Sequence, residues 1–264
     1  MPALFLDDQT TAILTSMLPR DMRQSNSCPY QQMTKPIIYQ LAYSPYCIPI
    51  TQALSAVGQE FETREVPNWE RGEILKLTNG SYYQVPVIQF EDRIVYESGT
   101  DTLDVARFVD EEFGQNKLFP KKFEGLQQII VPYIENDVEG TTFKILDSYY
   151  LMTLEDVRAR GMMIRHKERK FGRGCVEEWI RSRPQLLEKA VQLLRPFELM
   201  LAHSPFLLGE VPVYVDFALF GILENLLYGD WVEIPKELIR IKEWRETLRR
   251  FRYMMVTERN ISVN

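Results

Sequence analysis

Residues 39–50, YQLAYSPYCIPI, place a serine, a cysteine and two prolines in a turn that follows an apolar run. The run is typical of a short strand, and SPYCIPITQALSAVG predicts a turn and a helix that ends at Gly58. A side chain in this turn lies beside a helix N-terminus, where unpaired N–H groups and the helix dipole favour negative charge. Ser44 lies there, and its hydroxyl can donate to a thiolate. Such a bond contributes about 1.5–3 kcal/mol, equivalent to lowering a thiol pKa by about one to two units.

Simpler explanations of this turn stay open. Serine is a favoured N-cap and proline suits the first helical position, so Ser44 and Pro45 also fit a purely structural helix start. Cys47 lies three residues farther on and is expected to face inward as a small buried side chain. A reactive role for Cys47 would need an accessible thiolate.

The stretch QVPVI, residues 84–88, predicts a strand that opens with a proline. Proline donates no hydrogen bond to a sheet, so Pro86 belongs at the start of the strand. If the Val85–Pro86 bond is cis, the neighbouring peptide groups turn outward and Val85 can pair backbone to backbone with an extended peptide ligand. An ordinary trans proline at a sheet edge explains the same residues.

The third stretch is YESG, residues 96–99. Glu97 and Ser98 follow a predicted hairpin and open the next helix, so they offer a carboxylate and a hydroxyl beside N-terminal amides. This combination suits a ligand that carries both an ammonium and a carboxylate group. The pair is also a common way to begin a helix.

The elements expected around these residues follow the order βαβαββα over residues 36–114. Apolar residues at helical spacing from Leu103 to Phe113 mark one buried face of a helix that ends at Gly114. After the linker QNKLFPKK, the segments of residues 123–264 are typical of helix throughout. We therefore predict an α/β domain followed by an all-α domain.

Three features of the helical half are specific enough to check. DFALFGILENLLYG is apolar nearly all round, which predicts a buried central helix in which Gly221 lets a neighbour approach closely. Pro196 is expected to kink the preceding helix near its end. Ile241, Trp244 and Leu248 mark a further amphipathic helix.

Composition excludes several classes of function. The 264-residue chain has 31 Lys and Arg against 37 Asp and Glu, a formal charge of −6, which argues against an electrostatic nucleic-acid binder. Three distant cysteines favour a reducing compartment, and two histidines give no zinc-binding pattern, so no metal is expected. With no signal peptide and no apolar run of about 18 residues, we expect a cytoplasmic protein without a membrane, and residues 1–35 as an N-terminal extension.

In this order, and followed by a helical half, the three stretches resemble the cytosolic glutathione transferase superfamily over about residues 36–260. The resemblance implies the glutathione transferase fold: a thioredoxin-like βαβαββα domain over 36–114 that binds glutathione, and an all-helical domain over 123–264 that holds the second substrate. The SPYC turn also resembles the CPYC motif of glutaredoxins with the first cysteine replaced by Ser44. By this resemblance the protein is a serine-type, divergent bacterial or fungal member.

The resemblance also assigns the hydroxyl that acts on sulfur. Ser44 matches the residue that stabilises the glutathione thiolate in serine-type transferases. Some classes use a tyrosine near the end of the first strand, which makes Tyr43 the rival. Because the two residues are adjacent in a turn, we expect their side chains to point in different directions.

The remaining implied roles concern binding of the tripeptide. Val85 and Pro86 match the cis-proline step that pairs with the cysteinyl backbone of glutathione. Glu97 and Ser98 match the acid and the hydroxyl that hold its γ-glutamyl end. Gln84 would lie beside the tripeptide.

The sequence departs from the family pattern in three places. FLLGEVPVYVDFALFG resembles the family's signature before its buried helix, and Asp216 matches the capping-box acid, but Val213 replaces the usual Ser or Thr. This loses half of a reciprocal hydrogen-bond pair, worth about 1 kcal/mol. The loop LTNGSYYQVP differs from the common asparagine-proline-x-glycine form, and ERKFGRG has no counterpart in a minimal transferase.

The basic stretch over residues 158–175 allows two interpretations. It is typical of a solvated helix face, and it can also line the second-substrate pocket for an anionic aromatic molecule or bind acidic surfaces. The same ambiguity, pocket lining against core packing, holds for four side chains nearby: Tyr149, Tyr150, Met152 and Met162.

Three functions from different classes follow. The first is a glutathione-dependent transferase, expected to be a homodimer active in detoxification, that attacks a small hydrophobic or aromatic electrophile, with ether or halide cleavage among its reactions. The alternative is a non-catalytic glutathione-binding or protein-interaction module of the same fold. The third is a thiol–disulfide oxidoreductase that uses Cys47, ranked last because serine replaces the attacking cysteine.

Overall fold

The computed structural model describes residues 35–99 and 103–253. Apart from its last residue, the extension expected over residues 1–35 lies outside these ranges. In chain order the elements are β1 (Ile37–Gln40), α1 (Cys47–Val57), β2 (Glu62–Glu65), α2 (Gly72–Leu77), β3 (Val87–Phe90), β4 (Arg93–Val95), α3 (Asp104–Val109), η1 (Asp110–Gly114), η2 (Lys121–Phe123), α4 (Glu124–Tyr133), η3 (Ile134–Val138), α5 (Glu139–Thr153), α6 (Val157–Phe171), α7 (Cys175–Arg181), α8 (Arg183–Met200), α9 (Tyr214–Leu226) and α10 (Ile239–Arg250).

Four strands form a mixed sheet in the order β2-β1-β3-β4. β1 runs parallel to β2 and antiparallel to β3, and β3 pairs antiparallel with β4. A parallel pair needs a crossover, which α1 supplies, whereas the antiparallel pair β3–β4 is joined by a tight turn. The expected fold class, βαβαββ followed by a helical domain, is confirmed.

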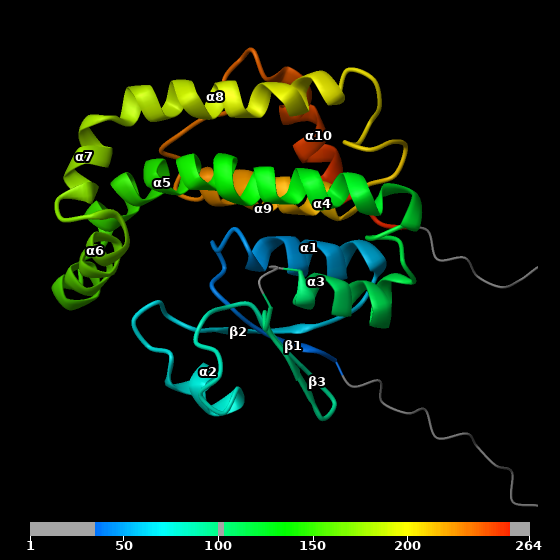
Figure 1. Ribbon diagram of the computed structural model, residues 1–264, viewed down its shortest axis with the longest axis horizontal. Coiled ribbons are helices and arrows are strands. Elements are labelled where there is room, and N and C mark those ends of the chain that lie inside the picture. The colour runs from blue at the N-terminus through cyan, green and yellow to red at the C-terminus, as the bar shows by residue number, and fades with distance from the viewer. Residues whose placement is uncertain (1–34, 100–102, 254–264) are drawn as a thin grey trace, which may run out of the picture. The chain divides into compact units, whose positions relative to one another are not determined.

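The alternation of side chains along the strands separates the two faces of the sheet. Ile38 and Ile88 pack in the main core with residues of α1 and α3, whereas Tyr39 and Val87 pack on the other face with Ile74 of α2. In Figure 1, α1 lies between the sheet and the helices of the second half. The turn before α1 therefore lies where the two halves meet.

Helix α9 is buried along nearly its whole length, as the sequence predicts. A Cβ atom added to Gly221 would lie 2.5 Å from the carbonyl oxygen of Pro45 and from ring carbons of Pro49, so the close approach expected at this glycine is confirmed. One turn farther on, Asn225 Nδ2 donates to the carbonyl oxygen of Tyr43 at 2.6 Å. Through these two contacts, helix α9 holds the turn between β1 and α1 in place.

The start of α9 shows how the chain accommodates Val213. The N–H of Asp216 donates to the backbone carbonyl of Val213 at 2.9 Å, and the Val213 N–H donates to Asp216 Oδ2 at 3.0 Å. Asp216 Oδ1 accepts from Leu207 N–H at 2.9 Å and from Trp244 Nε1 at 3.0 Å. Burial nevertheless raises the Asp216 pKa to about 6. The acid half of the capping box is therefore kept, and it also ties α10 to the start of α9.

The connection between the two halves is packed rather than free. The helix expected up to Gly114 is α-helical as far as Val109 and continues as the π-helical η1 to Gly114. The buried carboxylate of Asp110 accepts from the N–H groups of Leu118 and Phe119 at 2.9 and 2.8 Å. The segment expected to be a linker is thus held against the end of α3.

Pro132 and Pro196 lie beyond the first turn of their helices in the second half. Pro132 lies near the end of α4, and the π-helical η3 follows it before α5 begins, an arrangement that accommodates the missing proline N–H. Helix α8 continues through Pro196 to Met200. Ile241, Trp244 and Leu248 are buried on α10, as predicted. Within the described ranges, no helix has the length and apolar content to cross a membrane.

Candidate functional site

Two neighbouring cavities lie between the sheet domain and helices α5 and α6. The larger encloses about 580 Å³ and the smaller about 370 Å³. Tyr46, Gln84 and Val85 line both, so the two form one continuous site. We call its two sides the strand-side wall (Ser44, Gln84, Val85, Pro86 and Glu97) and the helix-side wall (Glu139, Phe143, His166, Lys167 and Lys170).

Ser44 lies in the turn before α1, where the sequence places it, and it lines the larger cavity. Its carbonyl oxygen accepts from the N–H groups of Cys47 and Ile48, both at 3.1 Å, and its Oγ accepts from Tyr46 N–H at 3.3 Å. The helix itself begins only at Cys47. Ser44 nevertheless makes both bonds of an N-cap, because its Oγ accepts from the N–H two residues farther on and its carbonyl oxygen accepts from the N–H of Ile48. The structural interpretation of Ser44 as a helix cap therefore fits these contacts, and the bond from Tyr46 does not use the hydroxyl proton.

Cys47 is fully buried, as expected. Burial raises the pKa of its thiol to about 11, and a hydrogen bond with the Ser44 hydroxyl opposes that shift only in part. A buried thiol that stays protonated is a poor nucleophile. The geometry therefore gives no support to the oxidoreductase interpretation.

Tyr43 has different partners from Ser44, although both line the larger cavity. Its hydroxyl accepts from Asn68 Nδ2 at 2.7 Å, and Arg71 Nη2 donates to Asn68 Oδ1 at 2.7 Å. Its ring packs 5.0 Å from the ring of Tyr150. Burial raises the pKa of Tyr43, so this phenol remains protonated.

Arg71, on the same side of the larger cavity, was not singled out from the sequence. Its Nη1 is buried and has no hydrogen-bond partner among the described residues. Burial lowers the pKa of Arg71, and its positive charge is one of the influences that lower the pKa of the nearby Cys47. The potential beside the Ser44 turn therefore favours a negatively charged sulfur.

The Val85–Pro86 peptide bond is cis. Val85 and Pro86 are buried and lie just before β3, whose pairing with β1 begins at Val87. The unusual loop before them is ordered by Thr78, whose Oγ1 donates to the Tyr82 carbonyl at 2.8 Å and accepts from the Tyr82 N–H at 3.1 Å. Gln84 then projects into both cavities.

Glu97 and Ser98 are neighbours in the chain, but only Glu97 lines the smaller cavity. Glu97 lines it and accepts from the N–H groups of Asp104 at 2.8 Å and Val105 at 3.4 Å, at the start of α3. Burial raises the pKa of Glu97 to about 7. Ser98 lines neither cavity, because both its N–H and its hydroxyl donate to the Asp104 carboxylate at 2.7 and 2.8 Å. Of the six site residues expected from the sequence, the structure brings five together and leaves Ser98 beside them.

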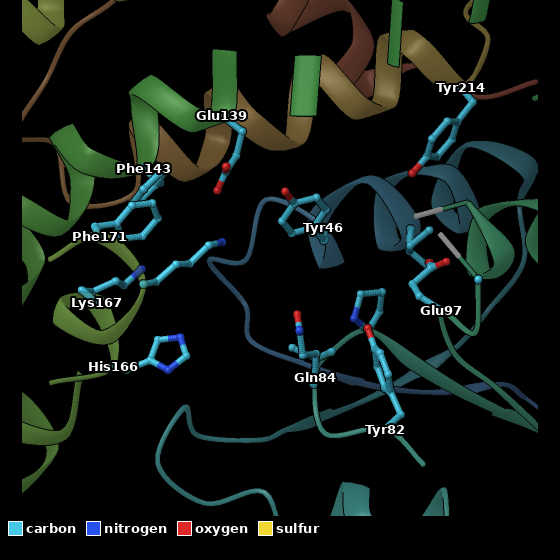
Figure 2. A pocket seen from close by; sticks show the side chains of 15 residues that line it. Tyr46, Tyr82, Gln84, Glu97, Glu139, Phe143, His166, Lys167, Phe171 and Tyr214 are labelled. Atoms are coloured by element: carbon cyan, nitrogen blue, oxygen red, sulfur yellow. The ribbon is translucent and has the colours of Figure 1, made fainter. Parts of the chain in front are cut away.

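The helix-side wall comes from α5 and α6. Figure 2 shows Glu139, Phe143, His166 and Lys167 facing Tyr46 and Gln84 across the cavity. Burial raises the pKa of Glu139 to about 7, and its carboxyl group accepts no hydrogen bond from a described residue. Lys167 Nζ lies 2.5 Å from Asp147 Oδ2. The basic stretch therefore lines the site on one face and is solvated on the other.

The four aromatic and thioether side chains near this wall divide between the two interpretations. Met162 lines the larger cavity. Tyr150 packs against Tyr43 and Tyr149 stacks on Trp231 with ring centroids 5.9 Å apart, so core packing accounts for both. Met152 is exposed and lines neither cavity.

The spacing of the residues in the helix-side wall is a signal that can be read from the sequence. Glu139 and Phe143 are four apart on α5, and His166 and Lys170 are four apart on α6, so each pair shares one helix face. The spacing does not indicate which face meets a cavity. Within the described ranges, no group of three His, Cys, Asp or Glu side chains has an arrangement that holds a metal ion.

Solved structures share this architecture, although sequence comparisons find no match. No family model and no curated protein matches the sequence. Among solved structures, the chain is similar to the glutathione transferase GSTFuA3 of Phanerochaete chrysosporium, with a TM-score of 0.68 and 16% identity over 85% of this chain and 100% of that one. It is also similar to glutaredoxin 2 of Salmonella typhimurium, solved in complex with glutathione (TM-score 0.63, 18% identity, 81% and 94% covered).

A bacterial transferase shows the same likeness. The glutathione S-transferase of Rhodospirillum rubrum matches with a TM-score of 0.60 and 18% identity over 81% of this chain and 88% of that one. The class defined by the fold is thus a thioredoxin-like domain followed by a helical domain. More particularly, it is the glutathione transferase fold.

Proposed function

We propose that this protein is a glutathione-dependent transferase that activates the glutathione thiol for attack on a small aromatic or hydrophobic electrophile. One observation carries the proposal: the Ser44 turn, the cis Val85–Pro86 step and Glu97 lie on one wall of a single site. That site occurs in a fold shared with solved glutathione transferases.

In the proposed complex, glutathione lies extended along the strand-side wall. The backbone of Val85 pairs with the cysteinyl residue, and the carboxylate of Glu97 binds the γ-glutamyl ammonium. Ser98 and the amides beside it hold the γ-glutamyl carboxylate, which requires Ser98 to exchange its bonds to Asp104 for bonds to the ligand. Gln84 lies beside the tripeptide.

The sulfur is placed at Ser44. The hydroxyl of Ser44 donates to the thiolate, and the N-terminus of α1 and the charge of Arg71 add favourable potential. A lower thiol pKa raises the fraction of nucleophile at neutral pH. The thiolate then forms a C–S bond with the electrophilic carbon, and the leaving group departs with its electron pair.

The test is the Ser44→Ala protein, with Tyr43→Phe as the control for the rival hydroxyl. In Ser44→Ala, we expect glutathione to bind while its thiol pKa rises by about one to two units, followed by the thiolate's ultraviolet absorbance. Turnover of an aryl halide at neutral pH should fall about tenfold or more. Full-rate turnover by Ser44→Ala would reject the mechanism, and loss of the thiolate signal only in Tyr43→Phe would transfer the role to Tyr43.

The same assays separate the transferase from the non-catalytic module. Retention on immobilised glutathione without turnover of aryl halides or aryl ethers would favour the module. We further propose a cytoplasmic homodimer of the serine type, which sedimentation and a liganded structure would test.

A further inference from the structure

The helix-side wall joins aromatic rings to positive charges. Lys167 Nζ lies 5.0 Å from the centre of the Phe143 ring, and Lys170 Nζ lies 5.2 Å from that of Phe171. The rings of Phe143 and Phe171 are themselves 5.2 Å apart. An aromatic molecule that enters this side therefore meets two rings and two ammonium groups (Figure 2).

The charges on this wall are only partly neutralised inside the protein. Lys167 is paired with Asp147, but Arg169 and Lys170, which also line the larger cavity, form no salt bridge with any described residue. Lys170 also acts on Glu139, but burial raises the pKa of that carboxyl group to about 7, so it is only partly ionised at neutral pH. The wall therefore retains a net positive charge.

The pKa of His166 reflects this positive charge. Its pKa is lowered from the usual value by burial and then by Lys167, Lys170 and Arg169, while Asp147 on α5 opposes the shift. The charged groups named among the main influences on the His166 pKa are thus three cations and one carboxylate. A bound anion would act in the opposite direction and raise the His166 pKa.

The same helix carries cations that do not face the cavity. Arg158 and Arg165 are exposed, and Arg165 pairs with Glu168 on its own helix. They line neither cavity. Helix α6 therefore carries cations outside the site and cations that line it, and Arg169 and Lys170 are themselves exposed.

We propose that the second substrate is an aromatic electrophile that bears an anionic group, with its ring against Phe143 and Phe171 and its anionic group at Lys170 and Arg169. The inference rests on the proposed function, because it names the substrate class for the second side of the same site. Cations beside aromatic faces recognise both parts of such a molecule.

The experiment uses two probes that differ in charge alone, 4-chloro-3,5-dinitrobenzoate and its uncharged carboxamide. Their affinities are measured by calorimetry on the full chain without glutathione, because the probes react with its thiol. We expect the benzoate to bind about tenfold more tightly than the carboxamide. Lys170→Gln should remove most of that preference, Lys170→Arg should retain it, and Arg158→Gln, the same charge change outside the site, should leave it intact.

Two results would overturn the inference: equal affinity of the wild-type protein for both probes, or an equal loss of preference in Arg158→Gln and Lys170→Gln. Chloride release with glutathione is followed separately. If neither probe is conjugated while the benzoate is still preferred in a Lys170-dependent manner, the proposed transferase fails and the anion-selective wall stands.

A spectroscopic readout checks the site without turnover. In a proton NMR titration, binding of the benzoate should raise the pKa of His166, and the carboxamide should leave it unchanged. In free Lys170→Gln, the His166 pKa should already lie above that of the wild type. A His166 pKa that responds equally to both probes would contradict an anion bound at Lys170.

Discussion

The two walls of the site are built in different ways. On the strand-side wall, polar groups are already fixed by the protein: Ser44 Oγ accepts from the Tyr46 N–H, and Glu97 accepts from two N–H groups of α3. On the helix-side wall, Lys167 is paired with Asp147, but the Glu139 carboxyl group and the Lys170 ammonium group have no such bonds to described residues. A wall fixed by backbone bonds suits one constant ligand, whereas a wall of long, loosely held side chains suits a variable one.

The strand-side wall nevertheless depends on the helical half for its position. Its turn is pressed against Gly221 of α9, and its backbone is held by Asn225. The distinction between a rigid wall and an adaptable one therefore holds only while this contact is intact. The predictions below test that distinction, in order of decreasing expected effect.

The largest effect is expected from Gly221→Ala. The new methyl group would overlap the Pro45 carbonyl and the Pro49 ring, both at 2.5 Å, so the Ser44 turn must move. Overpacking of this kind costs about 1–3 kcal/mol, and a 1 Å displacement of a reacting group can cost about 100-fold in rate. Urea unfolding and conjugation assays measure both.

Gly161→Ala on α6 is the matched control for that substitution. Nothing lies within 4 Å of the added methyl group, so stability should stay unchanged or rise by up to about 1 kcal/mol. If Gly221→Ala behaves like Gly161→Ala, the strand-side wall does not depend on α9.

A smaller effect is expected from Glu97→Gln. A glutamine has one acceptor oxygen where the carboxylate accepts from Asp104 and Val105, so the start of α3 should weaken by about 1 kcal/mol. Loss of the charge facing the ligand ammonium should weaken glutathione binding about tenfold. Calorimetry with glutathione checks this, and Glu139→Gln, which loses no hydrogen bond, should change that affinity by less than about twofold.

The smallest effect on ligand binding is expected from Glu139, whose main consequence is a pH dependence of stability. Burial raises its pKa in the folded protein from the ordinary value of 4.5 to about 7. Between these values the unfolded chain has lost the proton and the folded protein has kept it, so the free energy of unfolding falls as pH rises through this window and levels off above it.

Glu139→Gln should remove that component. Urea unfolding at several pH values would show the variant gaining on the wild type from about pH 4.5 to about pH 7. A constant difference across this range would mean that Glu139 is ionised in the folded protein and is held by charges on its own wall.

The sequence predicted the strand-side wall well because its signals are local. A proline that opens a strand, a serine in a turn before a helix and an acidic residue after a hairpin each follow from a few neighbouring residues, and the fold then places them on one site. Ser98 shows the limit of this reasoning, since its bonds to Asp104 depend on the path between Ser98 and the start of α3.

The helix-side wall was only half predicted for a physical reason. Periodicity shows which residues share a helix face, but not what that face meets, so the basic stretch allowed either solvent or a cavity. The structure shows both outcomes on α6, with Arg165 in solvent and Lys170 at the site. Arg71 and Asn68 were missed because their connection to Tyr43 exists only after the arm before α2 folds back.

By itself the sequence determined the order of strands and helices, the burial of α9 and the inward-facing Cys47 after the Ser44 turn, because hydrophobic spacing and turn residues act over short distances. Only the tertiary structure decided that α9 presses on this turn and that one side of α6 faces Ser44 across a cavity. These outcomes depend on the packing of segments more than a hundred residues apart, and periodicity carries no information about such packing.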